Sequence, residues 1–213
     1  MRDLLDPQKA LLFRITHAAN LRWILTNGLH CPNSAIRDPN FISIGNAELI
    51  ARRARRVVPR APGGVLNDYV PFYFTPLSPM LLNIKTGYSG ITQRTSEEIV
   101  ILVSSLATLQ EQDVQFVFSD RHAYMVDANF YSDLADLDKI DWGILQNRDF
   151  KYDPDDPSKM SRYMAEALAF RNVPISALIG VAVFNERARD RVNADLNASG
   201  IELSVAVRAN FYF

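Results

Sequence analysis

The chain has 213 residues, 48% of them hydrophobic, which is enough for a substantial core, and we expect a single domain over residues 1–213. Its 23 Lys and Arg residues nearly balance 24 Asp and Glu residues, and the net charge of -1 excludes binding to nucleic acid through an overall positive field. The single cysteine, Cys31, excludes an internal disulfide, and no stretch approaches the roughly 18 apolar residues of a membrane span, so we expect a cytoplasmic protein without a membrane partner.

The beginning of the chain predicts a strand followed by a helix. Residues 11–16 (LLFRIT) are typical of a short strand, and residues 17–27 (HAANLRWILTN) of an amphipathic helix that Gly28 ends. His17 then stands at a strand-to-helix junction, where free backbone N–H groups suit polar or anionic ligands. A helix cap or a packed side chain is an equally good interpretation of a lone histidine there.

A long, irregular connection follows, and it contains a run of arginines. Residues 30–67 are interrupted by several Pro, Asn and Gly turns, and a connection of this length inside one domain is usually functional. Its middle, residues 47–60 (AELIARRARRVVPR), predicts a short basic helix with five arginines. Such a run is most often a solvated face, but guanidinium groups beside a glycine-containing loop also suit phosphate.

The remaining chain is rich in strands. Residues 69–75 (YVPFYFT) are aromatic and β-branched, and further strand patterns lie at 98–104, 115–119, 178–184 and 203–208. A helix is expected at 186–198, before Gly200, and a second weakly patterned region lies at 120–156. Strands spread along the whole chain, with few helices and two long insertions, predict an α+β domain and not a regular βαβ succession.

The segment 164–170 (MAEALAF) has one charge, that of Glu166. Its residues favour a helix, whereas its shortness favours a strand, so the pattern leaves both structures open. An ionised carboxylate among apolar neighbours costs several kcal/mol unless it is paired. Glu166 is therefore either solvated on the wet face of a helix or engaged by a partner or ligand.

Several familiar signatures are missing, including GxGxxG, GxxxxGK[ST], HExxH and GxSxG. Three histidines without close spacing give no support to a metal site. What is left is a set of polar residues suited to binding a phosphorylated ligand and stabilising a cation with one carboxylate: His17, the arginine run, Tyr73, His122 and Glu166.

Longer blocks of sequence carry a specific resemblance. The blocks THAANLRWILTNGLHCPNS, IGNAELIARR, NDYVPFYFTPLSPML followed by GYSGI, and DDPSKMSRYMAEALAF resemble the DarT family, the DNA ADP-ribosyltransferase toxins of DarT–DarG toxin–antitoxin systems. The resemblance covers nearly the whole chain. It implies an ADP-ribosyltransferase fold, with a split, mostly antiparallel β-sheet, flanking helices and NAD in its cleft, and it makes 164–170 a strand.

The resemblance also implies site residues. Residues 35–55 resemble the NAD-binding loop and helix, and residues 120–160 the substrate-recognition loop region. Glu166 and Arg53 are the implied catalytic residues. The expected NAD contacts are Thr16, His17, Ala18, Leu25, Asn33, Arg53 and Tyr73. The expected DNA contacts are Tyr73, Met80, His122, Arg55 and Arg56.

Transfer of ADP-ribose from NAD requires a carboxylate such as that of Glu166. Breaking the bond between ribose and nicotinamide creates an oxocarbenium-like charge, which a carboxylate such as Glu166 stabilises. The implied activity is transfer of ADP-ribose from NAD, without a metal, to thymine in single-stranded DNA, with a DarG-like antitoxin that reverses the modification. Transfer to protein, RNA or another base, hydrolysis of NAD, and a non-catalytic nucleic-acid-binding module are the alternatives.

Overall fold

The computed structural model describes residues 4–213, which form a main sheet of eight strands in the order β10-β9-β4-β1-β3-β7-β5-β6. These strands are β1 (Leu11–His17), β3 (Tyr69–Tyr73), β4 (Ile99–Ser105), β5 (Phe116–Ser119), β6 (Phe130–Tyr131), β7 (Glu166–Phe170), β9 (Gly180–Val183) and β10 (Val205–Val207). Neighbours are antiparallel except β9 and β10, which are parallel. A small second sheet pairs β2 (Leu29–His30) with β8 (Asn172–Val173). The expected α+β fold with a mostly antiparallel sheet is confirmed.

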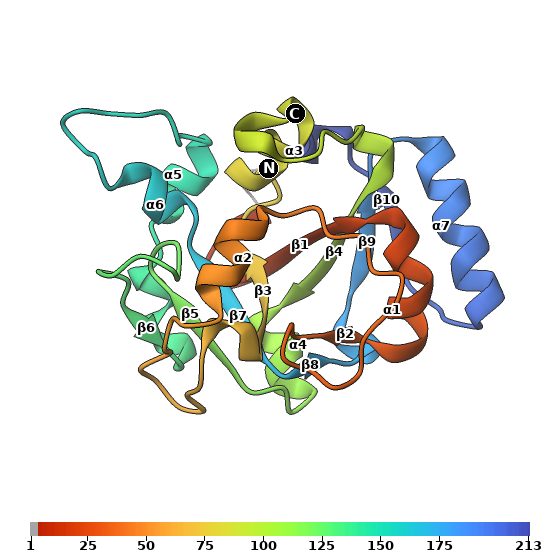
Figure 1. The fold of residues 1–213 in the computed structure, drawn as a ribbon, viewed down its shortest axis with the longest axis horizontal. Coiled ribbons are helices and arrows are strands. Elements are labelled where there is room, and N and C mark those ends of the chain that lie inside the picture. Colours follow the sequence, from red (N-terminus) through yellow and green to blue (C-terminus); the bar gives the residue numbers. More distant parts are fainter. Residues whose placement is uncertain (1–3) are drawn as a thin grey trace.

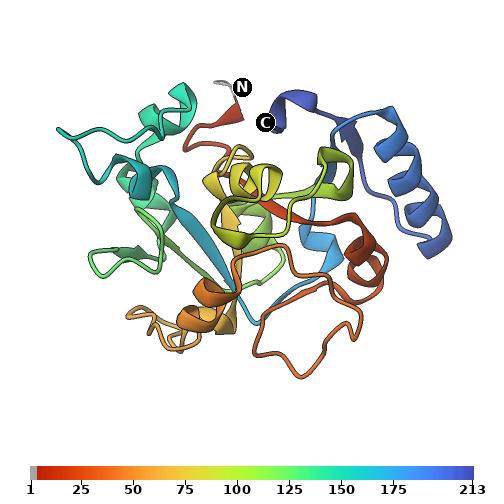
Figure 2. The same cartoon turned by 45° about the horizontal axis from the view of Figure 1, so that its top comes forward.

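Short helices flank the sheet (Figure 1). They are α1 (Leu21–Asn27), α2 (Ala47–Arg53), α3 (Pro79–Thr86), α4 (Leu106–Glu111), α5 (Trp142–Asn147), α6 (Lys159–Tyr163) and α7 (Glu186–Ser199). Helix α7 lies beside α1 and β10 at one end of the molecule, whereas α5, α6 and β6 lie at the other (Figure 1). Helix α2 lies between these ends, over β3 and β7 (Figure 1), and Figure 2 shows the same two ends of the molecule in a view turned by 45°. No helix of the described chain is both long and apolar enough to span a membrane.

The main sheet is nearly divided between β1 and β3. Strand β1 is paired with β4 along all its seven residues, but with β3 through one registered pair, Phe13 and Tyr73. Strand β3 is paired with β7 along all five of its residues. The sheet is therefore split into halves of four strands, as the resemblance implies. Because the two halves part beyond Phe13, the end of β1 at His17 borders the split.

Most predicted elements are confirmed, with small changes in their limits. The helix expected from His17 begins one residue later, as a 3₁₀ turn at Ala18–Asn20 that leads into α1. The main sheet takes strands from both ends of the described chain, and the single domain over residues 1–213 stays a prediction. The strand expected over 164–170 is β7; it begins at Glu166, because α6 continues to Tyr163 and Met164 caps that helix.

The helix expected over 47–60 was wrong beyond Arg53. Helix α2 starts well, because Asn46 caps it by accepting a hydrogen bond from the Leu49 N–H at 2.9 Å. It cannot continue to residue 60, since Pro59 disfavours helical geometry at the preceding residue and lacks the N–H that the helix needs. Val57 instead forms an isolated bridge with Val65.

Candidate active site

Glu166 occupies the middle of one half-sheet. It is the first residue of β7 and is registered with Tyr73 on β3 and Ser119 on β5. Directly opposed residues of antiparallel strands share a face, so the three side chains emerge on the same side of the sheet. Glu166 is 1% exposed, which excludes the solvated helix face that its sequence also allowed.

Arg53, from the last turn of α2, is the partner of this carboxylate. Its Nη1 donates to Glu166 Oε1 at 3.1 Å and its Nη2 donates to Oε2 at 2.9 Å. The pair is two-pronged and buried, with Arg53 only 9% exposed, and this geometry is the strongest that arginine and a carboxylate adopt. The two residues are 113 positions apart, so the pair fastens α2 and its loop to β7.

The loop after β5 supplies two more contacts to Glu166. The backbone N–H of Ala123 donates to Glu166 Oε1 at 3.1 Å. His122 Nε2 lies 3.6 Å from the same oxygen, and His122 is 7% exposed. The predicted recognition region therefore begins in direct contact with the predicted catalytic carboxylate.

These contacts set the ionisation of the site. Burial alone would raise the pKa of the Glu166 carboxyl, but attraction to Arg53 and the hydrogen bonds from Arg53 and Ala123 hold that pKa below its ordinary value. For the His122 imidazole, burial has the opposite effect and lowers the pKa. Attraction to Glu166 only partly opposes this, and repulsion by Arg53 lowers the pKa further. At neutral pH the site therefore contains a carboxylate, a guanidinium and an uncharged imidazole.

Tyr73 and Arg14 lie within the electrostatic reach of this pair. Burial, and then repulsion by Glu166, raise the pKa of the Tyr73 hydroxyl. Arg14 on β1 donates through Nη1 to the Pro71 carbonyl oxygen at 2.9 Å, across the split between β1 and β3. Burial, with repulsion by Arg53, lowers its pKa to about 10. Sequence reasoning missed Arg14, although a charged residue inside the apolar strand LLFRITH was a visible signal.

The predicted NAD contacts at the end of β1 lie along the split. His17 Nδ1 accepts a hydrogen bond from the Ala19 N–H at 3.1 Å, so His17 caps the turn that begins at Ala18. Its Nε2 lies 3.7 Å from Glu98 Oε1. The buried hydroxyl of Thr16 accepts a hydrogen bond from the Asn20 amide at 3.1 Å.

Two other predicted NAD contacts lie elsewhere. Leu25 is 2% exposed in the hydrophobic core on α1, so its side chain does not face a cleft. Asn33 is exposed and donates to Asp68 Oδ1 at 3.0 Å. Both residues remain predictions as NAD contacts.

A pocket of about 260 Å³ lies between α2 and α3. Its lining includes Tyr73 and Met80, both predicted to contact DNA, together with Asn46 and Arg52 of the α2 region and Met164 just before β7. Tyr73 thus connects this pocket to Glu166, its partner in the strand register. Within the described residues no group of three or more His, Cys, Asp or Glu side chains could hold a metal ion.

The arginine run is mostly used inside the fold. Arg52 pairs with Glu48 on α2, and Arg60 donates to the Phe130 carbonyl at 3.2 Å. Arg56 donates to the backbone carbonyls at residues 125 and 126. Arg55 differs, because its side chain is exposed and its guanidinium has no hydrogen bond or ion pair within residues 4–213.

A split, mostly antiparallel sheet with a buried, arginine-paired glutamate one strand away from the split defines a fold of the ADP-ribosyltransferase class. The chain belongs to the DarT family: the model of that family, described as ssDNA thymidine ADP-ribosyltransferase, DarT, matches residues 13–213.

Known relatives agree with this assignment. A DNA ADP-ribosyl transferase of Escherichia coli O127:H6 is 53% identical over 209 residues, which cover 98% of this chain and 96% of the relative. Among solved structures, Thermus sp. 2.9 DarT in complex with ADP-ribosylated ssDNA superposes with a TM-score of 0.89 at 33% identity, over 97% of this chain and 98% of that one. The same Thermus protein in complex with NAD+ gives a TM-score of 0.84 at 32% identity, over 97% and 99% of the two chains.

The Arg53–Glu166 pair predicts a strongly non-additive pair of substitutions. Arg53→Met should lower the free energy of unfolding by about 3 kcal/mol or more, because it leaves a buried carboxylate unpaired. Adding Glu166→Gln should recover a large part of this loss, since the double variant has no unpaired buried charge. Denaturant unfolding of the wild type, both single variants and the double variant measures the coupling. Additive losses would show that the pair contributes nothing beyond its separate residues.

The lowered pKa of His122 predicts a loss of stability in mild acid. In the unfolded chain a histidine titrates near pH ~6.5, so below that pH the unfolded state binds a proton more readily than the folded state. The free energy of unfolding should therefore fall as the pH drops from ~6.5 toward the lower folded pKa.

His122→Gln should flatten this fall, and a smaller slope should remain because burial, with the nearby Arg94, also lowers the pKa of His17. Urea denaturation at half-unit steps between pH ~7.5 and ~5 measures both slopes. Equal slopes in the wild type and the variant would contradict the assignment of a neutral, buried His122.

Proposed function

We propose that this chain transfers ADP-ribose from NAD to a thymine base of single-stranded DNA. The observation that carries the proposal is the buried, ionised Glu166, held by Arg53 on the face that it shares with Tyr73 in a chain of the DarT family. A carboxylate fixed in this way is available to stabilise positive charge without first losing a proton.

The split between β1 and β3 suits an extended dinucleotide. Positions 13 and 17 of β1 share a face and lie about 14 Å apart at ~3.4 Å per residue, and Phe13 is level with Tyr73. We assign Thr16, His17 and Ala18 to the adenosine side of NAD and Tyr73 to the nicotinamide side. Asn33 and Leu25 are assigned to the adenosine side by family resemblance alone.

NAD supplies the activated bond between ribose and nicotinamide, whose cleavage leaves positive charge on the ribose. Glu166 would stabilise that charge through a hydrogen bond from a ribose hydroxyl, which strengthens as the charge develops. Arg53 keeps the carboxylate ionised and oriented, and it is too basic to serve as a proton acceptor. The ring nitrogen of thymine gains the bond to ribose and loses a proton. We assign His122, which is uncharged and lies 3.6 Å from Glu166 Oε1, as the group that accepts this proton.

The DNA would approach over the pocket between α2 and α3. Met80 and Tyr73 line that pocket with surface suited to a base. Arg55, exposed and without a partner in the described chain, is the best placed arginine of the run to meet a phosphate. A single strand suits the site because no pairing or stacking with a second strand has to be broken to present the base.

The family resemblance further supports a toxin that works in the cytoplasm and is countered by a DarG-like antitoxin. That antitoxin would remove the modification from DNA. ADP-ribose attached to a thymine ring nitrogen would block the pairing edge of the base. A cell that makes this enzyme would therefore need such a reversal.

Glu166→Gln should abolish transfer and leave NAD binding largely intact, because the carboxylate acts mainly on charge that develops in the transition state. Mass spectrometry of a thymidine-containing oligonucleotide incubated with NAD measures transfer, and calorimetry measures NAD binding. Glu111→Gln, an exposed glutamate on α4, is the matched control. Retention of activity within about tenfold, which is ~1.4 kcal/mol, would remove Glu166 from the catalytic role.

The acceptor has its own test. Wild-type protein should modify single strands containing thymine, react much more slowly with the matching duplexes, and leave thymine-free strands unmodified. Comparable modification of thymine-free DNA, or preferential labelling of an added protein or RNA pool, would show that thymine is not the acceptor. Neither result would contradict NAD-dependent ADP-ribosyl transfer itself.

A further inference from the structure

The loop between β5 and β6, residues 120–129, displays an apolar tip. Val126 is 90% exposed, more than any other exposed large hydrophobic side chain in residues 4–213, and its neighbour Met125 is 41% exposed. A valine side chain this exposed contributes little to the stability of the folded chain, because almost none of its surface is removed from water. Together with Met125 it offers an apolar contact surface next to the site.

The backbone of this tip is held in place. Arg56 donates to the Met125 carbonyl at 2.8 Å and to the Val126 carbonyl at 3.3 Å. The Met125 N–H donates to the His122 carbonyl at 2.9 Å, and the Met125 carbonyl also accepts from the Ala128 N–H at 3.2 Å. Four hydrogen bonds thus hold the backbone of a turn whose side chains are exposed to solvent.

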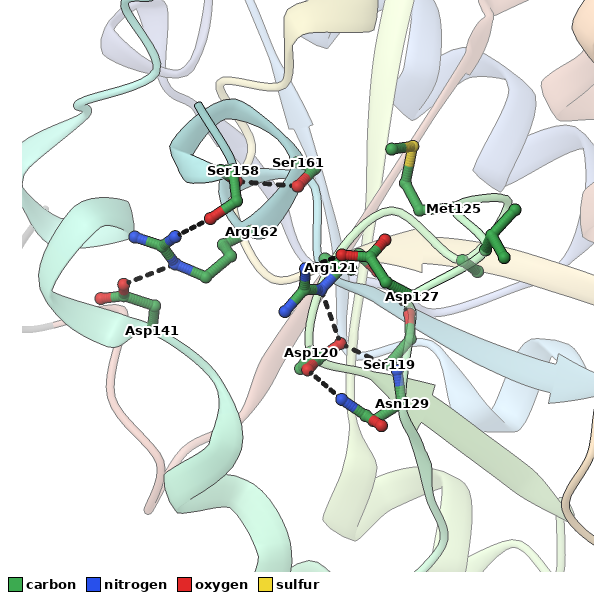
Figure 3. Close-up of polar contacts among 12 residues, drawn as sticks. Ser119, Asp120, Arg121, Met125, Asp127, Asn129, Asp141, Ser158, Ser161 and Arg162 are labelled. Carbon is green, nitrogen blue, oxygen red and sulfur yellow. Dashed lines mark hydrogen bonds and ion pairs between the residues drawn. The ribbon is translucent and has the colours of Figure 1, made fainter. Parts of the chain in front are cut away.

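The base of the loop is braced as well (Figure 3). Asp120 accepts hydrogen bonds from the backbone N–H of Asn129 at 3.1 Å and from its side-chain amide at 2.9 Å. Arg121 pairs with Asp120 at 3.3 Å and with Asp127, while the Ser119 hydroxyl donates to the Arg121 carbonyl at 2.7 Å. The single cation Arg121 thus partly offsets the two carboxylates of the loop, Asp120 and Asp127, which reduces their repulsion of a phosphate backbone.

The tip is also tied to the catalytic carboxylate. Ala123, whose N–H binds Glu166, is three residues before Val126, and three residues span at most about 10 Å. When a DNA base is positioned at Glu166, the next base along the same DNA strand is therefore within reach of Val126.

From this arrangement we propose that Val126, together with Met125, packs against the base next to the reacting thymine and selects the sequence around it. The proposal rests on the proposed function. Apolar side chains contact base faces readily and are used as wedges beside displaced bases. A loop that is already ordered loses little conformational entropy on binding, so a contact as small as a valine can still discriminate. Arg56 is then a positioning residue that acts through the backbone of the tip.

The test compares Val126→Ser with Ile179→Ser, a matched control that is 43% exposed and lies directly before β9 in the other half-sheet. The substrates are single strands with one thymine and each of the four bases on its 5′ or 3′ side. Mass spectrometry with saturating NAD gives kcat/KM for each strand. The wild type should prefer particular bases next to the thymine. Val126→Ser should lower kcat/KM on the preferred substrate about tenfold, and its kcat/KM values should differ less from one substrate to another. The control Ile179→Ser should match the wild type.

The outcomes separate this proposal from the proposed function. Wild type that modifies thymine with no preference for neighbours, or Val126→Ser with unchanged rates and preference, would overturn the role of the tip and leave thymine transfer intact. Wild type that modifies no thymine strand would overturn both.

Arg56→Ala tests the positioning role separately. A displaced tip should narrow the preference among neighbouring bases, as Val126→Ser does. A phosphate contact would instead weaken binding to every strand equally and reduce the slope of log affinity against log salt by about 0.7. That uniform loss would overturn the positioning role of Arg56. The wild-type Arg55 side chain lacks a partner in the described chain, so the variant Arg55→Ala shows what the loss of a phosphate contact alone would do.

Discussion

The ion pair between Arg53 and Glu166 is the interaction on which the site depends. A carboxylate 1% exposed to solvent could not stay ionised alone, and a guanidinium from α2 could not be buried against the sheet alone. The buried carboxylate of Glu166 and the buried guanidinium of Arg53 therefore stay charged only because they are paired with each other. The same contact fastens the long connection before α2 to β7, so the shape of the cleft and the ionisation of its carboxylate are set together.

The arginine run extends this arrangement to the loop after β5. Arg53 holds Glu166, Arg56 holds the tip of the loop after β5, and Arg60 holds the start of β6 through the Phe130 carbonyl. The loop returns to Glu166 through the Ala123 N–H. The basic segment 53–60, the loop after β5 and the start of β7 are distant in sequence, and these hydrogen bonds bring them together around Glu166.

Local patterns predicted the elements better than their contacts. β-branched and aromatic runs identified β1, β3 and β4, because such side chains fit a pleated, buried sheet. The strand β7 was ambiguous from its residues, whose helix propensity is overridden by pairing with β3 and β5. The partner of Glu166 could not be predicted, since Arg53 is 113 residues away and has arginines on both sides of it. Arg14 is visible in the sequence as a charge inside an apolar strand, but its role depends on a contact across a split that no local pattern reveals.

The ionisation of Glu166 can be measured directly. Infrared or carbon NMR titration of protein labelled with ¹³C at the glutamate carboxyls, with Glu166→Gln as the subtraction, isolates the signal of this one group. The geometry predicts that the pKa of the Glu166 carboxyl lies below 4.5, the ordinary value for glutamate. A Glu166 signal that titrates at or above that pH would contradict the arrangement, because Arg53 would then not be holding the carboxyl group in its ionised form.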